Sequence, residues 1–144
     1  MRFVQWTMGV LVITGCLFFP LSSYPRASAS PAKHKPGFVE IQIRNFIFEF
    51  HGGLLKPDLP ATILIKNLDK TQHGFTSPLL EEVEVRVETE SGISYGKGIR
   101  GVYINPQQEI QIHFTPLREG NLTFRCDLHP GMKGELLMLS IEAI

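Results

Sequence analysis

Short runs in which apolar and polar residues alternate dominate this sequence. The clearest are Val83-Val85-Val87, Val102-Ile104, Ile110-Ile112-Phe114, Leu122-Phe124-Cys126 and Leu137-Leu139-Ile141. A period of two is typical of half-buried β-strands, and Gly, Pro, Asn and Asp residues separate the runs. No segment has a helical period of useful length. The pattern predicts an all-β fold of about seven or eight short strands, arranged as a two-sheet Greek-key β-sandwich.

The first predicted strand changes the face of its apolar residues part-way along. Odd positions carry them up to Ile43, whereas even positions carry them from Phe46 to Phe50. A shift of one residue moves every following side chain to the opposite face of a sheet. We therefore predict a one-residue β-bulge near Arg44-Asn45.

A segment near the C-terminus carries three candidate metal ligands, Cys126, His129 and Met132, in the pattern Cys-x-x-His-x-x-Met. A tight loop with this spacing brings three donors to one ion, and a neighbouring strand must supply a fourth. His73 is the candidate, because it follows the strand-like run Ala61 to Asn67 and a turn-rich segment, which predicts a loop at one end of the sandwich. A thiolate, two imidazoles and a weak axial thioether suit copper that cycles between Cu(I) and Cu(II).

Other readings of these residues were weighed. A lone Cys is usually a small buried hydrophobic residue, and a lone His is usually structural or exposed. We interpret His34, His51 and His113 as solvent-facing, since they lie in a polar tail, at a Gly-Gly turn and on a polar strand face. Zinc is the alternative metal, but structural zinc sites close with four Cys or His ligands.

The segment Glu119 to Leu136 resembles the last hairpin of the cupredoxins, the blue copper proteins. It has a Gly turn, an aromatic residue two positions before Cys126, and Gly soon after Met132. The two residues between His129 and Met132 resemble the short amicyanin-type loop. The resemblance implies one type 1 copper ion, with His73, Cys126 and His129 as equatorial ligands and Met132 as the axial ligand.

This resemblance extends from Phe38 to Ile144, and one position departs from it. Gly74 stands where many relatives carry Asn or another polar residue after the first His. We expect a side-chain link across the site to be missing, although the Gly74 amide can still point at the Cys126 sulfur. The resemblance also implies that the C-terminal ligand, His129, lies in an apolar surface patch and conducts the electron.

Residues 1–29 have the features of a secretory signal peptide. Arg2 precedes a long apolar stretch, and Ala27-Ser28-Ala29 supplies a cleavage site. The stretch is too short for a confident membrane span. The alternative is a lipobox at Ile13 to Cys16, which would leave a lipid-anchored Cys16. We favour cleavage after Ala29, because apolar residues continue beyond Cys16, and we expect a periplasmic or secreted protein.

After that cleavage, residues 30–37 form a predicted linker and residues 38–144 one copper-binding domain, large enough for a core. Cys126 is then the only cysteine of the mature chain, and metal ligation explains an unpaired thiol in an exported protein. The sequence is formally neutral, with 14 Lys+Arg and 14 Asp+Glu. That balance argues against nucleic acid as a partner.

Four protein ligands leave no coordination position open for a small-molecule substrate. We therefore expect an electron carrier and not an enzyme, a monomer whose redox partner proteins dock near His129. The alternative function, with the same ligands, is a module that delivers or buffers Cu(I) for assembly of a copper enzyme. A small copper enzyme would need an open axial position, which Met132 argues against.

Two further segments have less specific patterns. The acidic stretch Glu81 to Glu90 is interpreted as the solvated face of an edge strand, with an acidic docking patch as the alternative. The Gly-rich segment Gly92 to Gly101 lacks the Lys-Ser/Thr ending of a phosphate loop, so we predict a mobile loop.

Overall fold

The computed structural model describes residues 36–140. The signal peptide predicted for residues 1–29, with its cleavage site at Ala29 and the alternative lipid site at Cys16, lies outside them. So does most of the predicted linker 30–37, although strand β1 (Gly37–Arg44) begins at its last residue. Within residues 36–140, no helix is long and apolar enough to cross a membrane.

The described residues form ten strands and one short helix, α1 (Pro78–Glu82). After β1, the strands are β2 (Ile47–Gly52), β3 (Ala61–Asn67), β4 (His73–Thr76), β5 (Glu84–Thr89), β6 (Gly92–Lys97), β7 (Gly101–Ile104), β8 (Glu109–Phe114), β9 (Gly120–Arg125) and β10 (Lys133–Met138).

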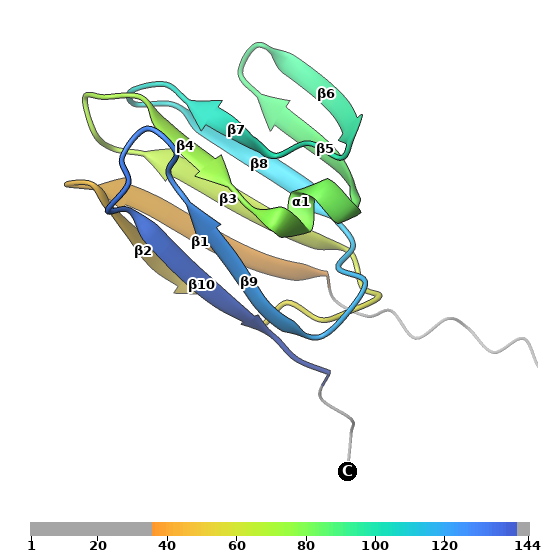
Figure 1. Cartoon of the computed structure of the whole chain (residues 1–144). Helices are drawn as coiled ribbons and strands as arrows, with labels where there is room; N and C mark the ends of the chain where they lie inside the picture. Colours follow the sequence, from red (N-terminus) through yellow and green to blue (C-terminus); the bar gives the residue numbers. More distant parts are fainter. Residues whose placement is uncertain (1–35, 141–144) are drawn as a thin grey trace, which may run out of the picture. The chain divides into compact units, whose positions relative to one another are not determined.

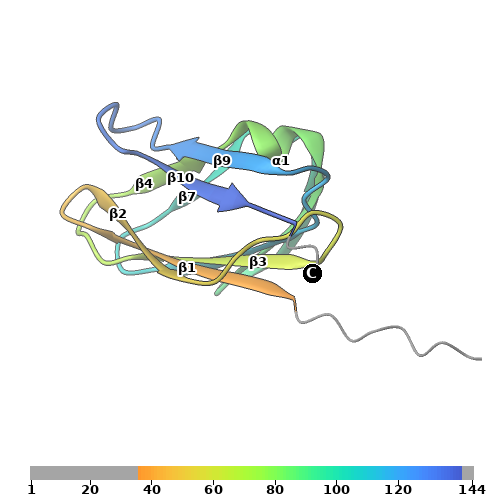
Figure 2. The same cartoon turned by 90° about the horizontal axis from the view of Figure 1, so that it is seen from below.

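Two β-sheets pack face to face, as Figure 1 and Figure 2 show from two directions. The six-stranded sheet has the order β2-β1-β3-β8-β5-β6, and the four-stranded sheet has the order β10-β9-β4-β7. β1 pairs with β3 in parallel, whereas the other neighbouring strands pair antiparallel. The predicted all-β, two-sheet sandwich is confirmed.

The bulge predicted near Arg44-Asn45 is wrong, because the chain reverses there. Arg44 pairs with Ile47, and the two residues between them, Asn45 and Phe46, have φ angles of 51° and 62°. Two consecutive left-handed residues are typical of a tight β-hairpin turn whose twist matches that of the strands. Ile43 pairs with Phe48, so an odd and an even position share one face.

The mobile loop predicted for Gly92 to Gly101 is wrong over its first six residues. They form β6, which pairs antiparallel with β5 at the edge of the larger sheet. Gly92 has a φ of 147°, which permits the reversal between the two strands. The alternation of Ile93, Tyr95 and Lys97 was the strand signal, and the glycines at positions 92, 96 and 98 obscured it.

The acidic stretch divides between a helix and a strand. Ser77 caps α1 by accepting a hydrogen bond from the Leu79 N–H, and Pro78 occupies the first turn. Glu81 lies 3.7 Å from Arg100, and Glu82 lies 2.7 Å from Arg118. These exposed pairs contribute little to stability, but they occupy two of the carboxylates that the acidic-patch reading counted.

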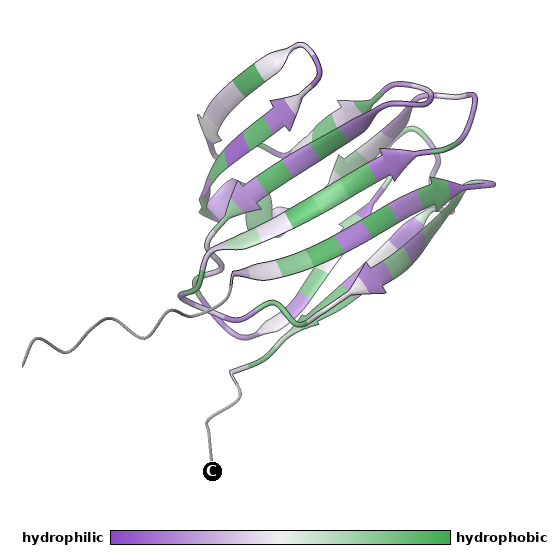
Figure 3. Cartoon of the chain, turned by 180° about the vertical axis from the view of Figure 1, so that it is seen from behind, coloured by the Kyte–Doolittle hydropathy of each residue, from purple (hydrophilic) through white to green (hydrophobic). Residues whose placement is uncertain are grey.

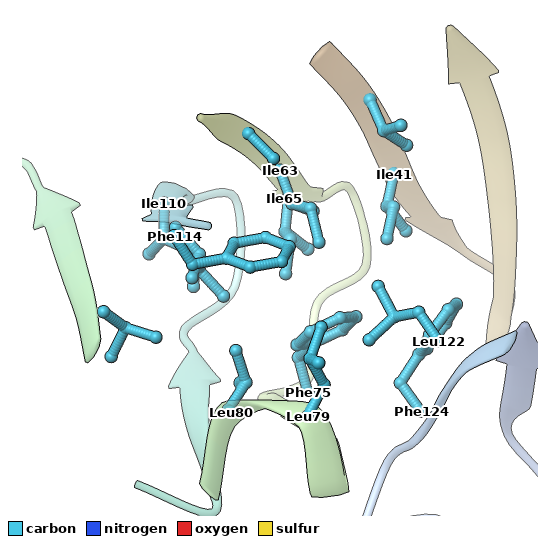
Figure 4. Close-up of a cluster of buried hydrophobic side chains, with 14 of the residues drawn as sticks. Ile41, Ile63, Ile65, Phe75, Leu79, Leu80, Ile110, Phe114, Leu122 and Phe124 are labelled. Atoms are coloured by element: carbon cyan, nitrogen blue, oxygen red, sulfur yellow. The ribbon is translucent and has the colours of Figure 1, made fainter. Parts of the chain in front are cut away.

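The hydrophobic core lies between the two sheets. Along β1, β3 and β8 every second side chain is buried in this core, and the same strands show banded hydropathy in Figure 3. Figure 4 shows Ile63 and Ile65 of the larger sheet opposite Phe75 and Leu122 of the smaller one, and all four are at most 1% exposed. Full burial of each such side chain is worth about 1.5–3 kcal/mol, so this core holds the sheets in a fixed relation.

Three connections gather at one end of the sandwich: the β1–β2 turn, the β3–β4 connection and the β9–β10 loop (Figure 2). His73 is the first residue of β4, not part of the preceding loop as predicted, because its backbone pairs with Ile104 of β7. A strand residue is held more rigidly than a loop residue. This end of the fold therefore brings distant parts of the sequence together, and strand pairing fixes one of them.

Candidate metal centre

Side chains from β4 and from the β9–β10 loop converge at this end. The donor atoms of His73, Cys126 and His129 all lie within 4.8 Å of one another. Cys126 Sγ is 3.9 Å from His73 Nδ1 and 3.4 Å from His129 Nδ1. Cys126 and His73 are buried, and His129 is half-buried. Residues separated by more than fifty positions thus present one sulfur and two nitrogens to a common point.

These separations can be compared with ordinary metal–ligand bonds. Protein ligands bind zinc at about 2.0–2.1 Å through nitrogen and at about 2.3 Å through sulfur, so a nitrogen and a sulfur on one ion are less than about 4.4 Å apart. Both separations from Cys126 Sγ meet that limit. The three donors therefore fit a single ion.

Met132 lies at the end of the same loop, with its side chain 4% exposed. Two backbone hydrogen bonds close the loop on itself, from Met132 N to His129 O at 2.9 Å and from Cys126 N to Met132 O at 3.0 Å. Three of the four predicted ligands are therefore on one internally bonded segment. A thiolate, two imidazoles and a buried thioether fit one type 1 copper site.

The far side of the His73 ring fixes which nitrogen faces the site. His73 Nε2 lies 3.0 Å from Asp69 Oδ2 and 3.3 Å from Thr71 Oγ1. A carboxylate can only accept a hydrogen bond, so Nε2 carries the hydrogen and Nδ1 is left with its lone pair toward Cys126. Burial lowers the pKa of His73, which favours the neutral imidazole that a metal needs.

Asp69 also anchors the β1–β2 turn. Its carboxylate accepts hydrogen bonds from the backbone N–H of Asn45 at 2.7 Å and of Phe46 at 3.0 Å. Burial acts to raise the pKa of Asp69, but the bonds from Phe46, Asn45 and His73 outweigh it and hold the pKa below its usual value. One ionised side chain therefore joins the turn to the imidazole of His73.

The β1–β2 turn places the aromatic ring of Phe46 over the site. Phe46 packs edge-on against His73, with ring centroids 5.3 Å apart, and against His129, with centroids 4.9 Å apart. Its own side chain is about half exposed. Neither Phe46 nor Asp69 was predicted to belong to the site. The spacing of four residues between Asp69 and His73 was the available signal, whereas Phe46 was assigned to a strand.

The Cys126 sulfur accepts a hydrogen bond from the backbone N–H of Gly74 at 3.1 Å. This is the backbone contact that we expected to remain possible with Gly, and not a polar side chain, at position 74. On the outer face of β4, the Tyr103 hydroxyl donates to Asp127 Oδ2 at 2.6 Å, and this bond raises the pKa of Tyr103. The residues that directly follow His73 and Cys126 are thus each engaged in a polar contact.

The two other histidines among the described residues, His51 and His113, lie away from this centre. His51 is exposed, as predicted, and His34 lies outside the described residues. His113 is half-buried on the outer face of the larger sheet, where Nδ1 lies 2.9 Å from Thr62 Oγ1 and Nε2 lies 3.4 Å from Glu88 Oε1. The prediction that His113 faces solvent is therefore correct in direction, but neighbouring strands cover part of the ring.

Comparisons with known proteins come from structure and not from sequence. No protein-family model matches the chain. None of the curated protein sequences matches it either. Among solved structures, it is similar to a copper nitrite reductase from Nitrosomonas europaea, at 12% identity with a TM-score of 0.53, over 80% of this chain and 52% of that one.

Two smaller proteins also match. An oxidised methionine-to-leucine mutant of amicyanin is 16% identical, with a TM-score of 0.45 over 69% of this chain and 80% of that one. Auracyanin A, a blue copper protein from Chloroflexus aurantiacus, is 16% identical, with a TM-score of 0.48 over 73% of this chain and all of the other. At these identities the comparisons concern the fold. The described chain has a cupredoxin-like fold.

Proposed function

We propose that this chain is an exported type 1 copper protein that carries electrons between redox partner proteins. The observation that supports it is the convergence of the Cys126 sulfur with two imidazole Nδ1 atoms, on a loop that ends with the buried Met132. When bound there, copper supplies a one-electron couple between Cu(I) and Cu(II). Everything else in the proposal concerns what the protein groups do.

The support around the donors favours a carrier. His73 is held by Asp69, the Cys126 sulfur by the Gly74 amide, and Met132 by two backbone hydrogen bonds. Ligands whose positions are fixed by neighbours need little movement when the charge of the site changes. A site of this kind suits transfer of an electron more than binding and release of the metal.

The surroundings of His129 support a docking surface there. His129 is half-buried, and the nearby Leu128 and Phe46 are 44% and 49% exposed. Exposed apolar groups around one partly exposed ligand suit a partner protein that binds briefly and exchanges an electron through that ring. We propose that redox partner proteins dock at this rim and that the chain acts as a monomer.

An enzymatic role has less support. A catalytic metal site keeps one coordination position open for water or substrate. Here a buried thioether ends the ligand loop, so the four side chains complete the set. The export signal predicted for residues 1–29 supports a periplasmic or secreted location for the carrier.

Cu(I) delivery is the second candidate. One observation favours it: Cys126, His129 and Met132 all belong to one short loop, in which Pro130 and Gly131 are exposed. A partner that moves this single loop would release three donors together. Delivery and electron transfer use the same ligands, so the two functions differ in how fast copper is released and not in the residues of the site.

Voltammetry and metal release separate the two candidates. A carrier should show a reversible one-electron wave when copper-loaded, and should lose Cu(I) slowly to a competing chelator. Cys126→Ser, which removes the sulfur from the site, is the control that should abolish the wave. A wild-type protein with no reversible wave and rapid loss of Cu(I) would support delivery instead.

A further inference from the structure

The side chain of Asp127 occupies the space that a side chain at position 74 would fill. A Cβ built on Gly74 would lie 2.1 Å from Asp127 Oδ1 and 3.3 Å from its Cγ. Real Cβ atoms do not approach other atoms so closely, so the two side chains exclude each other. The glycine at position 74 is therefore matched to the carboxylate at position 127.

Tyr103 holds that carboxylate in place. Its hydroxyl donates to Asp127 Oδ2 at 2.6 Å, a short bond of the charge-assisted kind. Tyr103 lies on β7 directly opposite Gly74 of β4. The tyrosine side chain thus joins β7, at the position paired with Gly74, to Asp127 of the ligand loop.

The Tyr103–Asp127 bond lies next to the two ligands His73 and Cys126, at a place where the strand ladder does not hold the ligand loop. Gly74 directly follows His73, and Asp127 directly follows Cys126. The ladder between β4 and β9 consists of one paired position, Thr76 with Arg125. Beyond that position, two hydrogen bonds reach the loop from the neighbouring strands: the Gly74 N–H of β4 donates to the Cys126 sulfur, and the Tyr103 hydroxyl of β7 donates to Asp127.

We propose that Tyr103 is a positioning residue of the metal centre, which acts through Asp127 to keep the Cys126 sulfur on the Gly74 N–H. A hydrogen bond to the sulfur favours the reduced site, in which the sulfur carries more negative charge. Loosening the tie should therefore lower the reduction potential. That consequence rests on the proposed copper function, whereas the hydrogen bond itself does not.

The test compares Tyr103→Phe with Tyr95→Phe. Tyr95 is 77% exposed on β6 of the other sheet, so its variant controls for loss of an exposed hydroxyl. We expect Tyr103→Phe to speed amide hydrogen exchange of Gly74 about tenfold in the metal-free full chain, as loss of one hydrogen bond would. It should also lower the reduction potential of the copper-loaded protein, and Tyr95→Phe should do neither.

A second pair of variants keeps the test independent of Tyr103. Asp127→Asn retains a carbonyl acceptor for the Tyr103 hydroxyl and should keep the Gly74 amide protected, whereas Asp127→Ala should expose it. If Tyr103→Phe and Asp127→Ala leave the Gly74 amide as protected as in the wild type, the proposal is wrong. Faster exchange with an unchanged potential would also overturn it, because the tie would then not act on the sulfur.

Failure of the copper function would be visible separately. A wild-type protein without a reversible wave would contradict the electron-carrier proposal. The exchange of Gly74 in the metal-free chain would still confirm or refute the tie between Tyr103 and Asp127.

Discussion

Phe46 packs edge-on against His129, with ring centroids 4.9 Å apart and planes at 83°. The same ring contacts His73, so one side chain from the β1–β2 turn covers both imidazoles. The Asp69 carboxylate accepts hydrogen bonds from the backbone of this turn and from the imidazole ring of His73. The outer boundary of the site is therefore built by a hairpin that contributes no ligand.

Removal of the Phe46 ring should open the site to solvent. Phe46→Ala keeps the Cβ, and with it the backbone strain at a φ of 62°, so the change isolates the ring. We expect faster copper loss to a chelator, with little change in the free energy of unfolding. Phe38→Ala is the control, because Phe38 is equally exposed, at 48% against 49%, but lies on β1 away from the ligands. Equal rates for the two variants would contradict a covering role.

A side chain at position 74 should be costly. In Gly74→Ala the added Cβ would overlap Asp127 Oδ1, so the carboxylate must move and lose its bond from Tyr103. We expect a loss of about 0.5–1.5 kcal/mol in the free energy of unfolding of the metal-free chain, the usual net contribution of one hydrogen bond. Gly131→Ala, in the ligand loop with no atom within 4 Å of the added Cβ, is the control and should be nearly neutral. Denaturant unfolding of both variants checks this.

The stability of the metal-free chain should fall at mildly acid pH through His113. Burial lowers the pKa of His113 below 6.5, and the charge of Arg86 adds to this. As the pH falls below 6.5, the unfolded chain takes up a proton before the folded chain does, so folding loses free energy. The loss ends once the pH is below the folded pKa. Glu88 and Thr62 also face this ring.

Urea unfolding of His113→Gln between about pH 8 and pH 5 tests that dependence. As the pH falls through this range, the free energy of unfolding of the wild type should decrease relative to that of the variant. His51→Gln, at an exposed position, is the control for loss of a histidine and should follow the wild type. A difference between wild type and His113→Gln that stays constant with pH would contradict the account.

Met132 should tune the site without holding the metal. Met132→Gln replaces a thioether with an oxygen donor and should lower the reduction potential, and Met132→Leu removes the donor and should raise it. Both variants should keep copper. Met138→Leu, a buried methionine on β10 outside the loop, is the control for the change in core packing. Loss of copper from either Met132 variant would assign Met132 a holding role, as the delivery alternative requires.

The sequence predicted the parts of the fold that depend on period alone. The alternation along β8 and β9 marked their buried faces correctly, because each of these strands has one face in the core. Along β10 it indicated the wrong face, since Leu137 and Leu139 are exposed whereas Leu136 and Met138 pack against the core. It failed at the β1–β2 turn, since Asn45-Phe46 is not a common turn sequence and Phe46 continues the apolar pattern. There the left-handed backbone depends on Asp69, a residue more than twenty positions away.

At the metal centre, too, features of the local sequence could be predicted and long-range contacts could not. A spacing rule identified Cys126, His129 and Met132, because three donors on one loop are a local property. His73 could be chosen by elimination among the histidines. The contacts of Tyr103 with Asp127 and of Phe46 with His129 join residues that only the tertiary fold brings together, so no local pattern could have indicated them.

The visible absorption spectrum of the protein loaded with Cu(II) tests the central claim most directly. A Cys126 thiolate bound to copper together with His73 and His129 should give an intense charge-transfer band and a strongly coloured protein. Cys126→Ser should bleach that band, because an alkoxide or hydroxyl cannot supply the sulfur electron. A colourless copper-loaded wild type, or a band that survives in Cys126→Ser, would contradict the assignment of a type 1 copper site.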